Sequence, residues 1–108
     1  MIASMAKKPI IFAMANPTPE IMPELAYEAG AKIVATGRSD YPNQINNVLV
    51  FPGIFKGAFE NNVQKITDGM KISAAEALAS SVKNISVDNI IPDPFQPDIS
   101  DIIAASIR

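Results

Sequence analysis

Neutral amide side chains gather at two places in this chain of 108 residues, which contains no cysteine and no histidine. Asn16 directly follows an apolar run, and the adjacent pair Asn46 and Asn47 closes a polar segment that follows a second apolar run. A carboxamide offers both donor and acceptor atoms, so it suits a ligand that bears carboxylate, hydroxyl or amide groups. Because an amide cannot take up a proton at neutral pH, these residues predict binding and orientation rather than acid–base catalysis.

The polar segment also contains residues that could bind an anion or shape the loop. Arg38 could grip a carboxylate with both arms of its guanidinium, but we expect it to pair with Asp40 at the surface. Gly37 permits a tight turn, and Tyr41 is a candidate loop anchor. The remaining acidic residues match no metal-binding spacing, so we assign this chain no catalytic residue and no metal ligand.

Each amide also has a purely structural interpretation. Asn16 could satisfy its own backbone in a turn, and Asn43 could cap a helix. Capping does not explain why two further asparagines follow Asn43, and Asn46 and Asn47 on one helical turn would point about 100° apart. They could therefore touch different parts of one ligand, such as a substrate and a cofactor.

The elements that must position these side chains can be read from apolar periodicity and turn residues. Residues 10–15 predict a strand buried on both faces, and residues 32–35 predict a second strand. Between them we expect a helix over 19–29 with Thr18 as its N-cap and Gly30 as its end. Strand, helix and strand this close together predict a parallel pair, and ligands bind at the carboxyl ends of such strands.

The rest of the chain is predicted to be mainly helical. Residues 51–53 should break one helix, and the proline-dense residues 90–97 should be irregular. We expect both ends of the chain to fall inside helices. Residues 1–108 would form one α/β domain with about two strands and four to five helices. The predicted helical segments are 1–8, 44–50, 54–63, a helix opened by Thr67 and Asp68, and one from Asp98 or Ser100 to Arg108.

Composition narrows the classes of partner. The formal net charge is −2, and the nine basic residues are scattered, so we expect no nucleic-acid partner. The apolar runs are far shorter than the roughly 20 residues of a membrane span, and the first residues do not form a secretory signal. The absence of cysteine fits a cytoplasmic protein, which is the location we expect.

Several motifs, in order along the whole chain, make the sequence resemble malic enzymes, notably the small bacterial type. Asn-Pro-Thr-Pro-Glu stands at 16–20, and Thr-Gly-Arg-Ser-Asp-Tyr-Pro-Asn-Gln-Ile-Asn-Asn stands at 36–47. The match continues through Phe-Pro-Gly-Ile-Phe-Lys-Gly-Ala at 51–58, the helix around 70–75 and Ile-Ile-Pro-Asp-Pro-Phe at 90–95.

This resemblance implies a fold, a reaction and roles for three residues. The fold would be a partial Rossmann-type three-layer parallel sheet, the C-terminal portion of a malic enzyme NAD(P)-binding domain. The reaction would convert L-malate to pyruvate and CO2 with NAD or NADP and a divalent metal, Mg or Mn, bound by residues outside this chain. Asn16 and Asn46 would bind substrate, and Asn16 and Asn47 would bind the nicotinamide cofactor.

The resemblance also implies partners and leaves alternatives. The chain would work with the rest of a malic enzyme polypeptide, in a homo-oligomer, and would be inactive alone. One alternative is a standalone module that binds a dicarboxylate or nucleotide without catalysis. Another is a purely structural or oligomerising piece.

Overall fold

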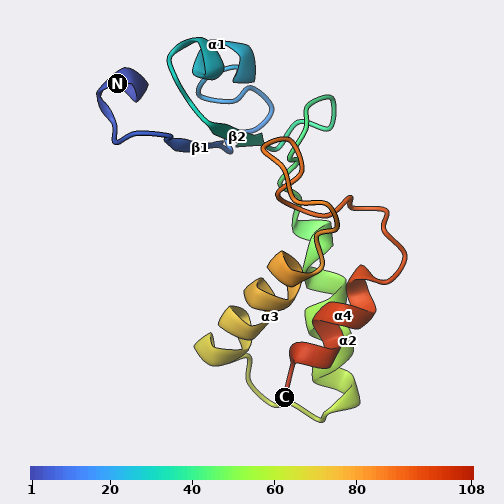
Figure 1. The fold of residues 1–108 in the computed structure, drawn as a ribbon. Coiled ribbons are helices and arrows are strands. Elements are labelled where there is room, and N and C mark those ends of the chain that lie inside the picture. Colours follow the sequence, from blue (N-terminus) through green and yellow to red (C-terminus); the bar gives the residue numbers. More distant parts are fainter. The chain divides into compact units, whose positions relative to one another are not determined.

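Two parallel strands, β1 (Ile10–Ala13) and β2 (Ile33–Thr36), form the sheet (Figure 1). The computed structural model describes residues 1–108, and Ile10 pairs with Ile33 at the start of the shared register. Helix α1 (Pro23–Glu28) connects the strands and packs against β2. The predicted strand–helix–strand arrangement with parallel pairing is therefore confirmed.

The chain divides into two compact units, each with its own core. The strand unit comprises Met1–Ile45 and Asn84–Ile90, and the helical unit comprises Asn46–Lys83 and Ile91–Arg108. The core of the strand unit consists of small apolar residues with partly buried isoleucines against them: Ala26, Ala31 and Val34, with Ile2, Ile11 and Ile21.

Strand β1 is buried on one side only, which corrects the prediction of two buried faces. Ala13 is buried, whereas Ile10 and Phe12 remain 56% and 52% exposed. The sheet contains two strands, and no other part of the strand unit covers these side chains. A continuous apolar run signals a double-sided strand only where elements cover both faces.

The ends of α1 and the N-terminal segment differ partly from the prediction. Helix α1 begins at Pro23, because proline fixes the φ angle needed in a first turn and lacks the N–H that would be unpaired there. Gly30 ends the helix with φ +108°, as predicted. The helix expected over residues 1–8 is only the 3-10 turn η1 (Ile2–Ser4), and Lys8 has a left-handed φ of +56°.

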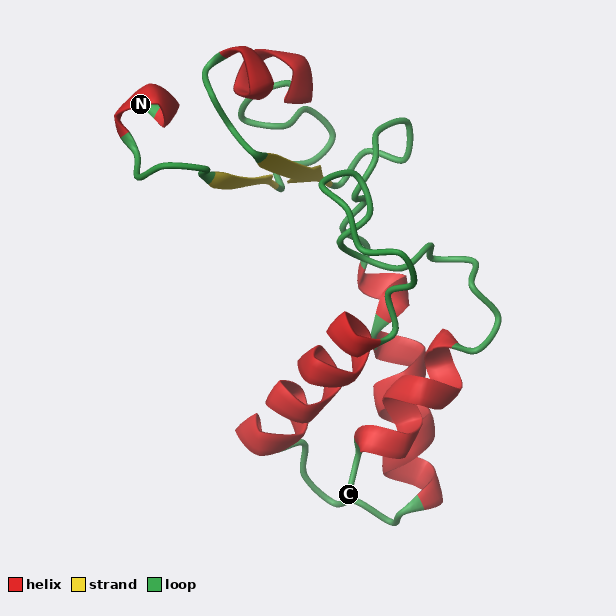
Figure 2. Ribbon diagram, viewed as in Figure 1, coloured by secondary structure: helices red, strands yellow, loops and turns green.

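Three α-helices make up the helical unit (Figure 2). Helices α2 (Phe51–Glu60) and α3 (Asp68–Ser80) both pack against α4 (Ile99–Ser106). Their shared core consists of Leu49, Ala74, Ile99, Ile103 and Ile107. The four α-helices of the chain and its two parallel strands confirm the predicted α/β class.

Two helical segments at the start of this unit differ from the prediction. The helix expected over 44–50 is only the 3-10 turn η2 (Asn47–Leu49). Pro52 and Gly53 lie in the first turn of α2, where proline is tolerated, so residues 51–53 open a helix instead of breaking one.

The other two helices lie close to their predicted positions. Thr67 caps α3 as expected, since its Oγ1 accepts the Met70 N–H at 3.2 Å. Asp98 precedes α4 without a side-chain capping bond, and that helix ends at Ser106 instead of continuing to Arg108. The segment 90–97 contains no helix or strand, as predicted.

Candidate ligand-binding site

Asn16 lies just beyond the carboxyl end of β1, with its side chain beside the backbone that leaves β2. A methyl group built on Gly37 would lie 3.8 Å from Asn16 Nδ2 and 4.0 Å from Asn16 Oδ1. The carboxamide is exposed and forms no hydrogen bond within the chain, so the self-satisfied turn considered above does not form. Both hydrogen-bonding ends of Asn16 are therefore available at the carboxyl edge of the sheet, where open α/β sheets bind ligands.

Glu20 closes the loop that presents Asn16. Its Oε1 accepts the N–H of Ala15 at 3.0 Å, across a turn that contains a cis Asn16–Pro17 peptide bond. This backbone hydrogen bond is the main cause that lowers the pKa of the Glu20 carboxyl from its ordinary value. The sequence interpretation placed Glu20 in a helix and missed its hydrogen bond with Ala15. The only signal for this bond in the sequence is that a carboxylate stands four residues after Asn16.

The polar loop after β2 returns to the end of that strand. The N–H of Ile45 donates to the carbonyl of Thr36 at 2.8 Å, and Gln44 forms a parallel bridge with Thr36. A closed loop of this kind holds its ends near the sheet edge. The loop therefore begins and ends at the carboxyl end of β2.

Asn43 holds this loop in place through buried hydrogen bonds of its side chain. It does not cap a helix, the role considered for it above. Its buried Nδ2 donates to the carbonyls of Val34 at 3.2 Å and Val87 at 2.8 Å. Its Oδ1 accepts the N–H of Ile90 at 2.9 Å, so both ends of the carboxamide are bonded within the strand unit. Asn43 joins β2, the loop and the segment around Val87, and no ligand-binding capacity remains in its side chain.

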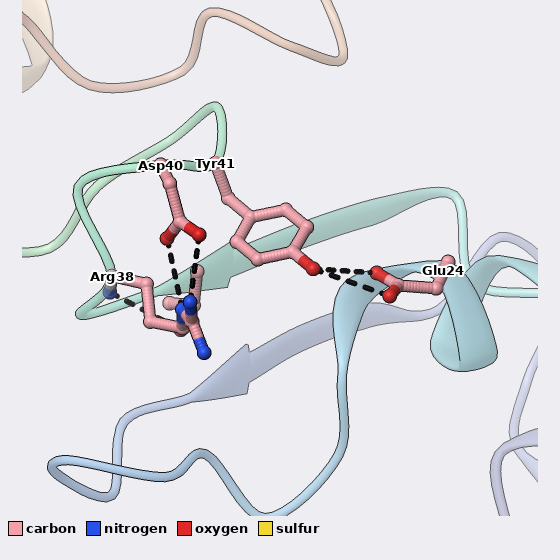
Figure 3. Close-up of polar contacts among 5 residues, drawn as sticks. Glu24, Arg38, Asp40 and Tyr41 are labelled. Atoms are coloured by element: carbon pink, nitrogen blue, oxygen red, sulfur yellow. Dashed lines mark hydrogen bonds and ion pairs between the residues drawn. The ribbon is translucent and has the colours of Figure 1, made fainter.

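A second set of contacts ties the outer part of the loop to α1 (Figure 3). Tyr41 donates its hydroxyl to the Glu24 carboxylate at 2.9 and 3.2 Å, which confirms Tyr41 as a loop anchor and raises the pKa of its phenol. Arg38 pairs bidentately with Asp40 at 2.7 and 2.8 Å, as expected, and lies 5.6 Å from the centre of the Tyr41 ring. Hydrogen bonds from Arg38 lower the pKa of Asp40.

The tandem asparagines begin the helical unit. Asn46 is the N-cap of η2, because its Oδ1 accepts the Val48 N–H at 3.1 Å. Its amide nitrogen forms no bond within the chain, so it can still donate to a ligand. Asn47, the first residue of η2, has an exposed side chain. The placement of this pair at a helical N-terminus is confirmed, although the turn is 3-10 and short.

No group of three or more His, Cys, Asp or Glu side chains is arranged to hold a metal ion. No helix has the length and apolar character needed to cross a membrane. The convergence of Asn16, Asn46 and Asn47 on one ligand stays a prediction, since Asn16 belongs to the strand unit and the other two to the helical unit.

Comparison with known proteins identifies similar chains along the whole sequence. The family model described as "Malic enzyme, NAD binding domain" matches residues 1–108. The bifunctional malic/malolactic enzyme of Bacillus subtilis is 57% identical over 109 residues, which are 99% of this chain and 27% of that protein. Further relatives are named as NAD-dependent or NADP-dependent malic enzymes.

Solved structures agree with this match. A crystal structure of malic enzyme from Pyrococcus horikoshii has a TM-score of 0.94 and 55% identity, covering 97% of this chain and 24% of that one. A crystal structure of NAD-dependent malic enzyme from Thermotoga maritima has a TM-score of 0.91 and 54% identity, covering 98% of this chain and 28% of that one. The chain thus spans about a quarter of the length of these relatives.

Proposed function

Because the chain belongs to the malic enzyme family and matches its NAD-binding domain, we propose that it contributes carboxamides to an active site that oxidises and decarboxylates L-malate. The products are pyruvate, CO2 and the reduced form of NAD or NADP. The observation that carries this proposal is the unbonded, exposed carboxamide of Asn16 beside Gly37, at the carboxyl edge of the parallel strands. Open α/β sheets bind their ligands in the crevice at that edge.

In this proposal the chain binds and orients its ligands. Asn16 and Asn46 hydrogen-bond the carboxylate and hydroxyl groups of malate, and Asn16 and Asn47 hold the nicotinamide side of the cofactor. The amide nitrogen of Asn46 is suited to donate to a carboxylate, because its oxygen is already used to cap η2. Fixing the reacting carbon against the nicotinamide lowers the barrier by removing the entropy cost of finding that geometry.

The divalent metal of the proposed reaction is assigned to residues outside this chain. Residues 1–108 offer no cluster of acidic, histidine or cysteine side chains to hold it. A bound Mg or Mn ion supplies Lewis-acid polarisation of substrate oxygens. The carboxamides of this chain fit the uncharged, hydrogen-bonding part of the site, since each can bond a hydroxyl, carboxylate or amide without adding charge.

The proposal extends to the setting of the reaction. The chain acts together with the rest of a malic enzyme polypeptide, in a homo-oligomer in the cytoplasm. The exposed Ile10 and Phe12 of β1 support the first point, because an apolar strand face of this kind is normally covered in an α/β domain.

The experiment that tests the proposed role replaces Asn16 by Ala in a malic enzyme polypeptide that contains these 108 residues. We expect kcat/KM for malate to fall by about 100-fold, a typical loss when a reacting group is misplaced. The melting temperature should not change, because the Asn16 side chain forms no bond within the chain. Unchanged kinetics in a folded variant would remove Asn16 from the site.

A second experiment separates a part of an enzyme from a standalone module. The isolated chain should not turn over malate in the presence of Mg or Mn and NAD or NADP. Decarboxylation by the pure chain would contradict the assignment of the metal and the catalytic groups to other residues. A melting temperature raised by malate or NAD without turnover would favour the standalone binding module.

A further inference from the structure

The five glycines of the chain differ in why the fold needs them. Gly30 has φ +108°, a backbone conformation that other residues rarely adopt. At Gly53 an added Cβ would lie 2.5 Å from Ile103 Cβ, and at Gly57 it would lie 2.6 Å from the carbonyl oxygen of Ala104. Conformation or packing therefore accounts for these three glycines within the chain.

Gly37 is not accounted for in either way. Its φ lies outside the left-handed region, so the backbone conformation at the bend after β2 does not itself require glycine. An added Cβ would meet nothing closer than 3.8 Å, an ordinary van der Waals distance. The strand unit itself would thus accept alanine, although glycine costs more chain entropy on folding.

The position of Gly37 indicates what the missing side chain leaves open. Gly37 directly follows β2, and the atoms nearest to an added Cβ are both polar ends of the Asn16 carboxamide and the Ile45 carbonyl oxygen at 3.9 Å. A side chain here would stand against the carboxamide that the proposed function assigns to ligand binding. Glycine is the residue that lets a ligand approach the backbone closely.

We propose that Gly37 is a specificity-determining residue, whose missing side chain leaves space for the nicotinamide ring of the cofactor beside Asn16. This inference rests on the proposed function. A planar ring can lie flat against a glycine backbone while its own carboxamide bonds a neighbouring amide. Malate has no flat apolar face, and its charged groups call for donors such as Nδ2 of Asn16 and Asn46.

The test replaces Gly37 by Ala in a malic enzyme polypeptide that contains these 108 residues. The KM for NAD or NADP should rise at least about tenfold, and the Kd for the reduced cofactor, measured by its fluorescence, should rise in parallel. The KM for malate should rise by a smaller factor than the KM for the cofactor, because the added methyl would lie 3.8 Å from Asn16 Nδ2, an ordinary contact distance. The melting temperature should stay the same or rise, because the added methyl fits and restricts the unfolded chain.

Gly69→Ala is the matched control. Gly69, on α3, likewise has a free Cβ position, with Thr67 Oγ1 at 3.8 Å as the only neighbour, and it has no assigned ligand. This variant should leave both KM values unchanged. Gly37→Val, with a larger side chain, should weaken cofactor binding further than Gly37→Ala.

Three results would overturn the inference: an unchanged cofactor Kd in a folded Gly37→Ala protein, a rise confined to the KM for malate, or a large fall in melting temperature. The fluorescence titration needs no malate turnover, so it reports on Gly37 even if the proposed reaction is wrong. A parent protein that binds the reduced cofactor but does not convert malate would contradict the proposed function and leave the Gly37 comparison valid.

Discussion

Asparagines of the same chemical type serve different purposes in this chain, and their hydrogen bonds distinguish them. Asn43 uses both ends of its carboxamide within the strand unit, Asn46 uses only its oxygen, and Asn16 uses neither end. A buried amide with all bonds made stabilises the fold, whereas an exposed amide with free donors can serve a ligand. Substitutions at these positions should therefore affect different measurements.

Asn43→Asp tests the structural amide. The carboxylate keeps the size of the side chain and tolerates φ +59°, but it cannot donate to the carbonyls of Val34 and Val87. We expect a loss of about 3 kcal/mol in the free energy of unfolding, measured by urea denaturation, since one buried and one partly buried acceptor lose their donor and a charge is buried. Asn43→Gly retains the backbone conformation without any of these bonds. A change below about 0.5 kcal/mol in both variants would contradict the assigned role.

Asn46→Asp tests the half-used amide. Aspartate can still accept the Val48 N–H and cap η2, but it lacks the donor and adds a negative charge. If Asn46 donates to a malate carboxylate, the KM for malate should rise by at least about 30-fold, which corresponds to about 2 kcal/mol for a lost charge-assisted bond. Asn46→Ser, which also caps, separates the loss of the donor from the added charge. Equal KM values in all three proteins would exclude contact with substrate.

At the element scale, the loop before α1 depends on a single carboxylate. The folded-state pKa of Glu20 is lowered, chiefly by the hydrogen bond from Ala15 N–H, so its stabilising effect is fully present above the ordinary carboxyl pKa. That effect disappears as the pH falls through the lower folded-state pKa. NMR titration should show the Ala15 amide and the Glu20 carboxyl changing together, at a pH below that of an unperturbed glutamate. In Glu20→Gln the Ala15 amide should no longer titrate.

The contact of α2 with α4 depends on glycines that allow the helices to approach closely. In Gly57→Ala, the added methyl would lie 2.6 Å from the Ala104 carbonyl oxygen and 2.8 Å from Ile107 Cβ. Overpacking of this kind costs about 1–3 kcal/mol, against a helix-propensity gain of about 1 kcal/mol, so we expect a net loss near 1 kcal/mol. Thermal unfolding should show it, whereas Gly69→Ala should be neutral or stabilising. A stabilised Gly57→Ala protein would mean that the two helices are farther apart.

Local signals predicted those elements whose cause is local. Gly30 and Thr67 marked a helix end and a helix start correctly, because a left-handed φ and a side-chain cap depend only on neighbouring residues. Pro52 and Gly53 were misread as a break, since the same pair can open a helix whose glycine packs on a distant one. Nothing in the sequence around Gly53 indicates that it packs against Ile103, fifty residues away in the chain.

At the scale of the whole molecule, the candidate site was predictable as a set of residue types but not as a geometry. The amides after each strand identified Asn16, Asn46 and Asn47 as candidates. The location of Asn16 at a strand end and of Asn46 at a helical N-terminus was also predictable. The bonds of Asn43 to Val87 and Ile90 join segments more than forty residues apart. Pairings of that range depend on the packed fold, so a pattern in the sequence did not reveal them.

The exposed face of β1 predicts how the isolated chain behaves. Ile10 and Phe12 are more than half exposed on one face of a sheet of two strands, and each strand also has an unpaired edge that can pair with another chain. We expect the isolated chain to self-associate with rising concentration in sedimentation velocity experiments and to bind an apolar fluorescent dye. Phe12→Thr keeps strand propensity but removes apolar area, so it should reduce both signals. Ile72→Thr removes an exposed apolar side chain from α3 instead, and it should leave both signals nearly unchanged. A monomer at every concentration, with no dye bound, would mean that the chain itself covers this strand face.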